Sequence, residues 1–262
     1  MMATRKTVRI DVLPESAWRY SGYDAIVCVD VLLSATTIVT AVAQGRRVKV
    51  APDAARGAAA AAGLYEPLLL TDGLSSSDDT LRFGGPAFLA AETKVKPLVH
   101  VSPFATMLES AAQRARVYVA CLRNFEATAK ELALHHRRVV VIGAGEDGEL
   151  CAADQMATAW MALRLQGRDF DLEGRHTVDE VTRWAPSDVS LIGLSRSAER
   201  LRSRGRDAEV AFVLRHVNDL TSVCSYDAGE VGDPVVRRRT VEENTPTPAW
   251  GTRSLPRAMD SL

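Results

Sequence analysis

Two carboxylates in this sequence have the spacing to do chemistry together. Asp30 stands near the C-terminal end of the apolar residues 25–31, and Asp154 follows a second apolar run at 138–142, near the start of a helical segment. The C-terminal ends of parallel strands converge on one edge of a sheet, so we expect the two acids to meet there. Paired carboxylates with hydroxyl and amide donors suit a Mg²⁺ ion that neutralises and orients a phosphate.

Hydroxyl groups follow Asp30 closely along the chain. Ser34, Thr36 and Thr37 lie at the start of a segment with helical apolar spacing, and Gly45 stands where a helix C-terminal cap belongs. Unpaired backbone N–H groups at a helix start, beside hydroxyls, favour an anion, so we predict a phosphate-binding turn here. The alternative is an ordinary strand–helix unit with a hydroxyl cap and no ligand.

A glycine-rich motif, GAGEDG at 143–148, follows a strand and precedes a helix, as in dinucleotide-binding proteins. Glu146 and Asp147 would repel a pyrophosphate at that helix start. A dinucleotide site also needs a second strand ending in an acid about 20 residues further on. Because residues 167–176 contain no apolar strand run, the sequence argues against nicotinamide or flavin binding.

Two other features allow two interpretations each. His100 lies at the end of a predicted strand, where it is either catalytic or structural. Residues 72–86 are rich in glycine and serine, which fits a solvated loop or an active-site loop after a strand.

The elements that must position these residues alternate regularly between strand and helix. Predicted strands cover 7–13, 25–31, 47–51, 67–71, 97–101, 117–122 and 138–142, and predicted helices cover 35–44, 53–63, 105–115, 126–134 and 152–165. This alternation predicts an α/β fold, with three α/β/α layers around a largely parallel sheet.

The pattern changes after residue 166. We expect an amphipathic helical piece at 178–184, one helix over 190–204 and a further helix at 209–213, with segments 222–226 and 234–236 closing the fold. Residues 1–236 are predicted to form a single α/β domain, with two sub-domains meeting near 135–150 as the alternative. Residues 237–262 are polar and proline-bearing, and are predicted to be a tail.

Composition excludes several functional classes. The 262 residues carry a formal net charge of −1, so no overall field attracts nucleic acid or an anionic membrane. No apolar run approaches the roughly 20 residues that span a bilayer. The four cysteines form no CxxC pair, which argues against a metal or disulfide framework. We therefore expect a cytoplasmic protein with neither a nucleic-acid nor a membrane partner.

The motifs together are similar to those of a known family. Residues 30–45, DVLLSATTIVTAVAQG, resemble the DVLRASTTIVTALANG-type signature of the 2-phosphosulfolactate phosphatases, magnesium-dependent enzymes associated with coenzyme M synthesis. Residues 143–159 resemble that family's CAG-x-x-G-x-FSLED-x-x-AAG segment, with Gly145, Gly148 and Asp154 on matching positions. Asn124 falls on the Asn of a GSFLNASAVA-like segment, and residues 216–236 resemble the closing segment.

The resemblance covers roughly residues 5–240 and implies a Mg²⁺-dependent phosphatase acting on a small phosphorylated acid or related metabolite, with homo-oligomerisation by analogy. It places Asp30 and Asp154 as catalytic and metal-binding residues. It places six residues at the substrate: Ser34, Thr36, Thr37, Ser102, Asn124 and Gly145.

Four departures from the family pattern affect the expected substrate. Leu33 replaces the signature arginine, a bidentate phosphate partner, and Ala153 replaces the first acid of the ED pair. TDGLSSSDD replaces a GGERNG-like loop, for whose arginine Arg82 is a possible substitute, and VSPFA around Ser102 replaces TTNGT. These changes predict an altered substrate. The alternative is a relative with a silent pocket, or one repurposed to tailor a secondary metabolite.

Overall fold

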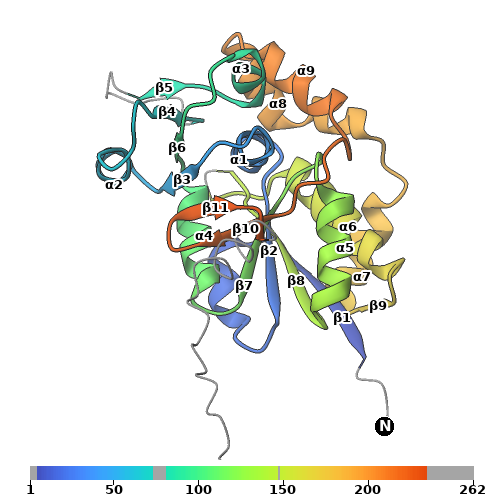
Figure 1. Ribbon diagram of the computed structural model, residues 1–262. Coiled ribbons are helices and arrows are strands. Elements are labelled where there is room, and N and C mark those ends of the chain that lie inside the picture. Colours follow the sequence, from blue (N-terminus) through green and yellow to red (C-terminus); the bar gives the residue numbers. More distant parts are fainter. Residues whose placement is uncertain (1–4, 73–80, 147, 235–262) are drawn as a thin grey trace, which may run out of the picture.

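The computed structural model describes residues 5–72, 81–146 and 148–234. The strands in these ranges form one sheet of eleven, in the order β5-β4-β6-β3-β11-β10-β7-β2-β8-β1-β9 (Figure 1). Their bounds are β1 Lys6–Asp11, β2 Ala25–Val29, β3 Val48–Ala51, β4 Leu68–Thr71, β5 Arg82–Phe83, β6 Leu98–Val101, β7 Arg116–Ala120, β8 Arg138–Gly143, β9 Phe170–Leu172, β10 Cys224–Asp227 and β11 Glu230–Gly232.

The sheet consists of two parallel sets joined by an antiparallel hairpin. One set is β5-β4-β6-β3 and the other is β7-β2-β8-β1-β9. Between them, β10 runs antiparallel to β7 and β11 runs antiparallel to β3. The hairpin turns at Ala228 and Gly229, whose φ angles of 46° and 85° suit the two-residue turns that match strand twist.

Helices cover both faces of this sheet, which confirms the predicted three-layer α/β fold (Figure 1). Val27 and Val29 of β2 pack in a core with α5, α6 and α7, whereas Ile26 and Cys28 pack in a second core with α1 and α4. β2 is therefore buried on both faces, as its unbroken apolar run predicts. The helices are α1 Ser34–Ala43, α2 Ala54–Ala61, α3 Pro86–Ala91, α4 Phe104–Ala112, α5 Phe125–His135, α6 Ala152–Gln166, α7 Arg175–Trp184, α8 Arg196–Ser203 and α9 Asp207–Arg215, with 3-10 helices η1 Pro14–Arg19 and η2 Val189–Leu194.

The single helix predicted over 190–204 is wrong. Ser195 is extended (φ −69°, ψ 156°) and separates η2 from α8. Its hydroxyl accepts a hydrogen bond from the N–H of Ala198, 3.3 Å away, so Ser195 begins a new helix as an N-cap.

One strand prediction also needs correction. Residues 167–176 do contain a strand, β9, which pairs with β1 at the sheet edge, where Asp171 forms an ion pair with Arg5. Three residues in register with a neighbour suffice for an edge strand, even without an apolar run. Of the predicted closing segments, 222–226 overlaps β10, and β11 follows it through a two-residue turn. Residues 235–236 of the other segment lie outside the described residues. The predicted tail lies outside the described residues.

Candidate functional site at the sheet edge

Asp30 and Asp154 lie at neighbouring strand ends. Asp30 directly follows β2, and Asp154 is in the first turn of α6, the helix after β8. β2 and β8 are parallel neighbours, with Val29 opposite Gly143. A side chain at Gly143 would place its Cβ 3.2 Å from the Cβ of Asp154, so this glycine lets the helix start close to the strand end.

Asp154 holds two turns of the backbone in place. It is 3% exposed; its Oδ1 accepts from the N–H of Val31 at 2.9 Å and its Oδ2 accepts from the N–H of Gly145 at 3.1 Å. Gly145 has φ +67°, and a Cβ there would lie 2.7 Å from the carbonyl oxygen of Glu149, so the turn requires glycine. Asp154 therefore fixes the turns after β2 and after β8 relative to each other.

The two acids form an uncompensated negative centre. Burial, followed by the negative charges of Asp154 and Asp72, raises the pKa of Asp30 well above its ordinary value. Burial likewise raises the pKa of Asp154 to about 7, although its two amide hydrogen bonds oppose the shift. No described basic side chain forms an ion pair with either acid. A bound cation would relieve the repulsion and favour both ionised forms.

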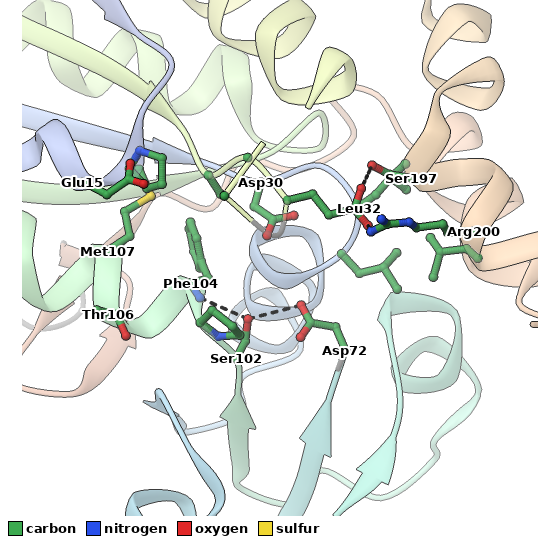
Figure 2. Close-up of a pocket in the computed structure, with 18 of the residues that line it drawn as sticks. Glu15, Asp30, Leu32, Asp72, Ser102, Phe104, Thr106, Met107, Ser197 and Arg200 are labelled. Carbon is green, nitrogen blue, oxygen red and sulfur yellow. Dashed lines mark hydrogen bonds and ion pairs between the residues drawn. The ribbon is translucent and has the colours of Figure 1, made fainter. Parts of the chain in front are cut away.

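A third acid, Asp72, arrives from the other parallel set. It directly follows β4, and Ser102 directly follows the neighbouring strand β6. Oδ2 of Asp72 accepts from the hydroxyl of Ser102 at 3.3 Å (Figure 2). It also accepts from the hydroxyl of Ser34, and the two serine oxygen atoms are 2.7 Å apart. Three segments distant in sequence thus converge on one carboxylate.

Asp30, Asp72 and Ser102 border a cavity of about 790 Å³ (Figure 2). Its acids are Asp30, Asp72, Glu15 and Glu146, and an apolar part is formed by Leu32, Leu33, Phe104 and Met107. Helix α8 contributes Ser197, Arg200 and Leu201, and Arg204 follows at its C-cap. The cavity therefore combines acidic groups at the strand ends with cationic groups from one helix.

The predicted site residues divide between the cavity and the turns beneath it. Asp30, Ser102 and Gly145 line the cavity, and Ser34 contacts Ser102. Four others do not line it: Asp154, Thr36, Thr37 and Asn124. Their polar groups are buried and bonded to backbone. Asp154 accepts from two amides, Thr36 donates to Val31 O and Thr37 to Leu33 O, both at 2.9 Å, and Asn124 bonds the N–H of Cys121 and the carbonyl of Val119.

The sequence reasoning missed Asp72 and the α8 arginines. Asp72 follows an apolar strand as Asp30 does, a signal that the loop interpretation overlooked. Arg200 forms an ion pair with Glu146 at 2.8 Å, and Glu146 also accepts from Ser197 at 2.5 Å. The side chain of Arg204 forms no ion pair with any described residue. Arg82 is exposed and is not among the cavity residues.

The donor set suits Mg²⁺ even though the described ranges contain no group of three or more His, Cys, Asp or Glu placed to hold a metal ion. Magnesium keeps several waters and is usually held by one or two carboxylates together with substrate phosphate oxygens. Asp30 and Asp154 are two such carboxylates, both buried and without basic partners in the described structure, and Asp30 lines the cavity.

Comparison with known families gives a match over most of the chain. A family model described as 2-phosphosulpholactate phosphatase matches residues 12–228. The chain belongs to this family. The match includes the described strands from β2 to β10, and the family name denotes a phosphatase, a phosphoric monoester hydrolase. No curated protein matches the chain. No helix in the described ranges is long and apolar enough to cross a membrane.

Proposed function

We propose that this 2-phosphosulfolactate phosphatase family member is a Mg²⁺-dependent phosphatase that hydrolyses a small phosphorylated acid. The observation that carries the proposal is the buried pair Asp30 and Asp154, which has no basic partner in the described structure. Asp30 lines the cavity, and Asp154 lies behind it, bonded to the turns after β2 and β8. A phosphate ester is itself anionic, so it enters such a site only when a cation offsets the acids.

The chain's own residues have distinct tasks in this proposal. Asp30 and Asp154 would hold the ion through carboxylate oxygens, and the ion would supply charge neutralisation and orientation of the phosphate. Ser102 places its hydroxyl on the cavity wall, where it can exchange its hydrogen bond to Asp72 for one to a phosphate oxygen. Asp154 accepts hydrogen bonds from the amides of Val31 and Gly145, and so keeps the turn after β2 and the turn after β8 in a fixed arrangement.

The acid group of the substrate is assigned to the cationic side of the cavity. Leu33 removes positive charge from the turn after β2, whereas Arg200 and Arg204 bring charge from α8. Guanidinium groups bind carboxylates and similar anions with two parallel hydrogen bonds. A substrate with a second anionic group would thus span the cavity from the acids to α8.

A second candidate function is ligand binding without turnover. The buried Leu33 lines the cavity where the resemblance places an arginine, and this favours a repurposed or silent pocket. The two functions differ in whether phosphate is released.

The deciding experiment measures phosphate release from a panel of small phosphomonoesters, with and without Mg²⁺. We expect Mg²⁺-dependent release that falls by at least about 10²-fold in Asp30→Asn, as removal of a key electrostatic group does. Asp53→Asn is the matched control, because Asp53 caps α2 away from the cavity and asparagine caps equally well. Tight Mg²⁺ or ester binding with no release from any ester would favour the silent pocket.

A further inference from the structure

Asp72 is held through one oxygen only. Its contacts with described side chains are all made by Oδ2: the hydroxyls of Ser34 and Ser102, and Nε2 of His100 at 3.8 Å. Oδ1 accepts no hydrogen bond from a side chain in the described ranges. Since the side chain is 16% exposed and lines the cavity, Oδ1 is the oxygen left for a ligand or a water molecule.

Behind this carboxylate lies a histidine without hydrogen bonds. His100 on β6 is 1% exposed, and within the described ranges neither of its ring nitrogens has a hydrogen-bond partner. Buried polar groups are nearly always paired, so an orphan beside a cavity calls for an explanation. Asp72 is the charged group within reach. Catalytic hydrogen bonds are often long in the free protein and tighten when the substrate binds.

The environments of the two cavity carboxylates differ in a useful way. Burial acts to raise the pKa of Asp72, but His100 and the hydroxyl of Ser34 outweigh it, so the pKa is lowered. The pKa of Asp30 moves upward. Pairs of acids driven apart in this manner commonly divide catalytic roles between them.

We propose that Asp72 is a further catalytic residue, the general base that takes a proton from the attacking water through Oδ1, and that His100 is its positioning residue. The inference rests on the proposed phosphatase function. As the water oxygen bonds to phosphorus, its proton passes to Asp72 and the bond between phosphorus and the ester oxygen breaks. The ester oxygen leaves with the bonding electron pair and takes a proton from solvent, to which Asp72 later returns its own.

The first test separates a base from a metal ligand and from a structural residue. In Asp72→Asn the amide oxygen still accepts from the two serines, so the fold is retained while the base is lost. We expect kcat to fall about 10²–10⁴-fold, with KM and the Mg²⁺ concentration for half-maximal activity nearly unchanged. In Asp72→Ala, added formate should restore part of the activity. Asp179→Ala, an exposed acid on α7, is the control.

The second test asks whether His100 acts through Asp72. His100→Asn should lower kcat about tenfold without changing KM, and the same change should cost nothing further in an Asp72→Ala background. Circular dichroism and thermal melting of each variant check that it folds. Additive losses would overturn the positioning role.

Two other outcomes would overturn the base assignment, and they are distinguishable. If Asp72→Asn keeps full activity while Asp30→Asn loses it, the phosphatase function stands and the base is wrong. If the wild-type protein releases phosphate from no ester, the proposed function fails and the base assignment fails with it.

Discussion

At the scale of single residues, the site depends on acids that the fold places at a free-energy cost. Asp30 and Asp154 are both buried, and burial raises both pKa values. A carboxyl whose pKa is raised on folding binds its proton more tightly in the folded than in the unfolded protein. Its contribution to the free energy of unfolding is therefore most favourable below the unfolded pKa of about 4 and is lost as pH rises through the folded pKa.

This gives a prediction for the metal-free protein. Because the pKa of folded Asp154 is about 7, its part of the free energy of unfolding should fall as pH rises from about 4 to about 7, by an amount on the order of 2–4 kcal/mol. Mg²⁺ should reverse the loss, raising the melting temperature more at pH 8 than at pH 5. Urea and thermal unfolding in chelator, then in Mg²⁺, measure both effects. Equal stabilisation by Mg²⁺ at the two pH values would contradict the assigned ion site.

At the scale of elements, α8 delivers charge through its periodicity. Ser197, Arg200, Leu201 and Arg204 follow the spacing i, i+3, i+4 and i+7, and all four line the cavity. That spacing was present in the sequence, which predicted a helix over 190–204 but no role for its arginines. The role was missed because periodicity identifies a helix face and not the surface that the face meets.

The prediction at this scale concerns Arg204, the arginine without a described ion-pair partner. Arg204→Gln should raise KM about tenfold or more for esters that carry a second anionic group, the loss expected for one charged hydrogen-bonding contact. Neither kcat nor the KM of an ester lacking that group should change much. Arg114→Gln, on the exposed segment after α4, provides the control. Equal effects on both kinds of ester would place the arginine outside the substrate contact.

At the scale of the whole molecule, local sequence patterns predicted which segments form strands and helices better than they predicted which strands pair in the sheet. Seven strands, β1 to β4 and β6 to β8, followed from apolar or alternating runs, whereas the two-residue β5 was not predicted. The parallel arrangement followed from strand–helix alternation. Sheet order did not follow, because it depends on pairing between distant segments, such as Glu230 opposite Lys49. Asp30 and Asp154 were found because their strands are neighbours in the parallel set. Asp72 was missed because it reaches the cavity from the other set.

The hairpin that joins the two sets also provides a test of how the molecule folds. Val231 is 3% exposed in the same core as Val48 and Val119, so β10 and β11 cover strand edges and bury apolar surface together. A chain ending at residue 222 lacks the hairpin and leaves β3 and β7 with unpaired edges, which favours aggregation.

A chain ending at residue 234 keeps every strand of the described sheet and is the matched control. We expect the longer chain to melt in one transition within a few degrees of the full-length protein, and the shorter chain to be insoluble or unfolded. If the shorter chain stays soluble and melts in two separate transitions, the parallel sets are independent sub-domains and the hairpin only tethers them.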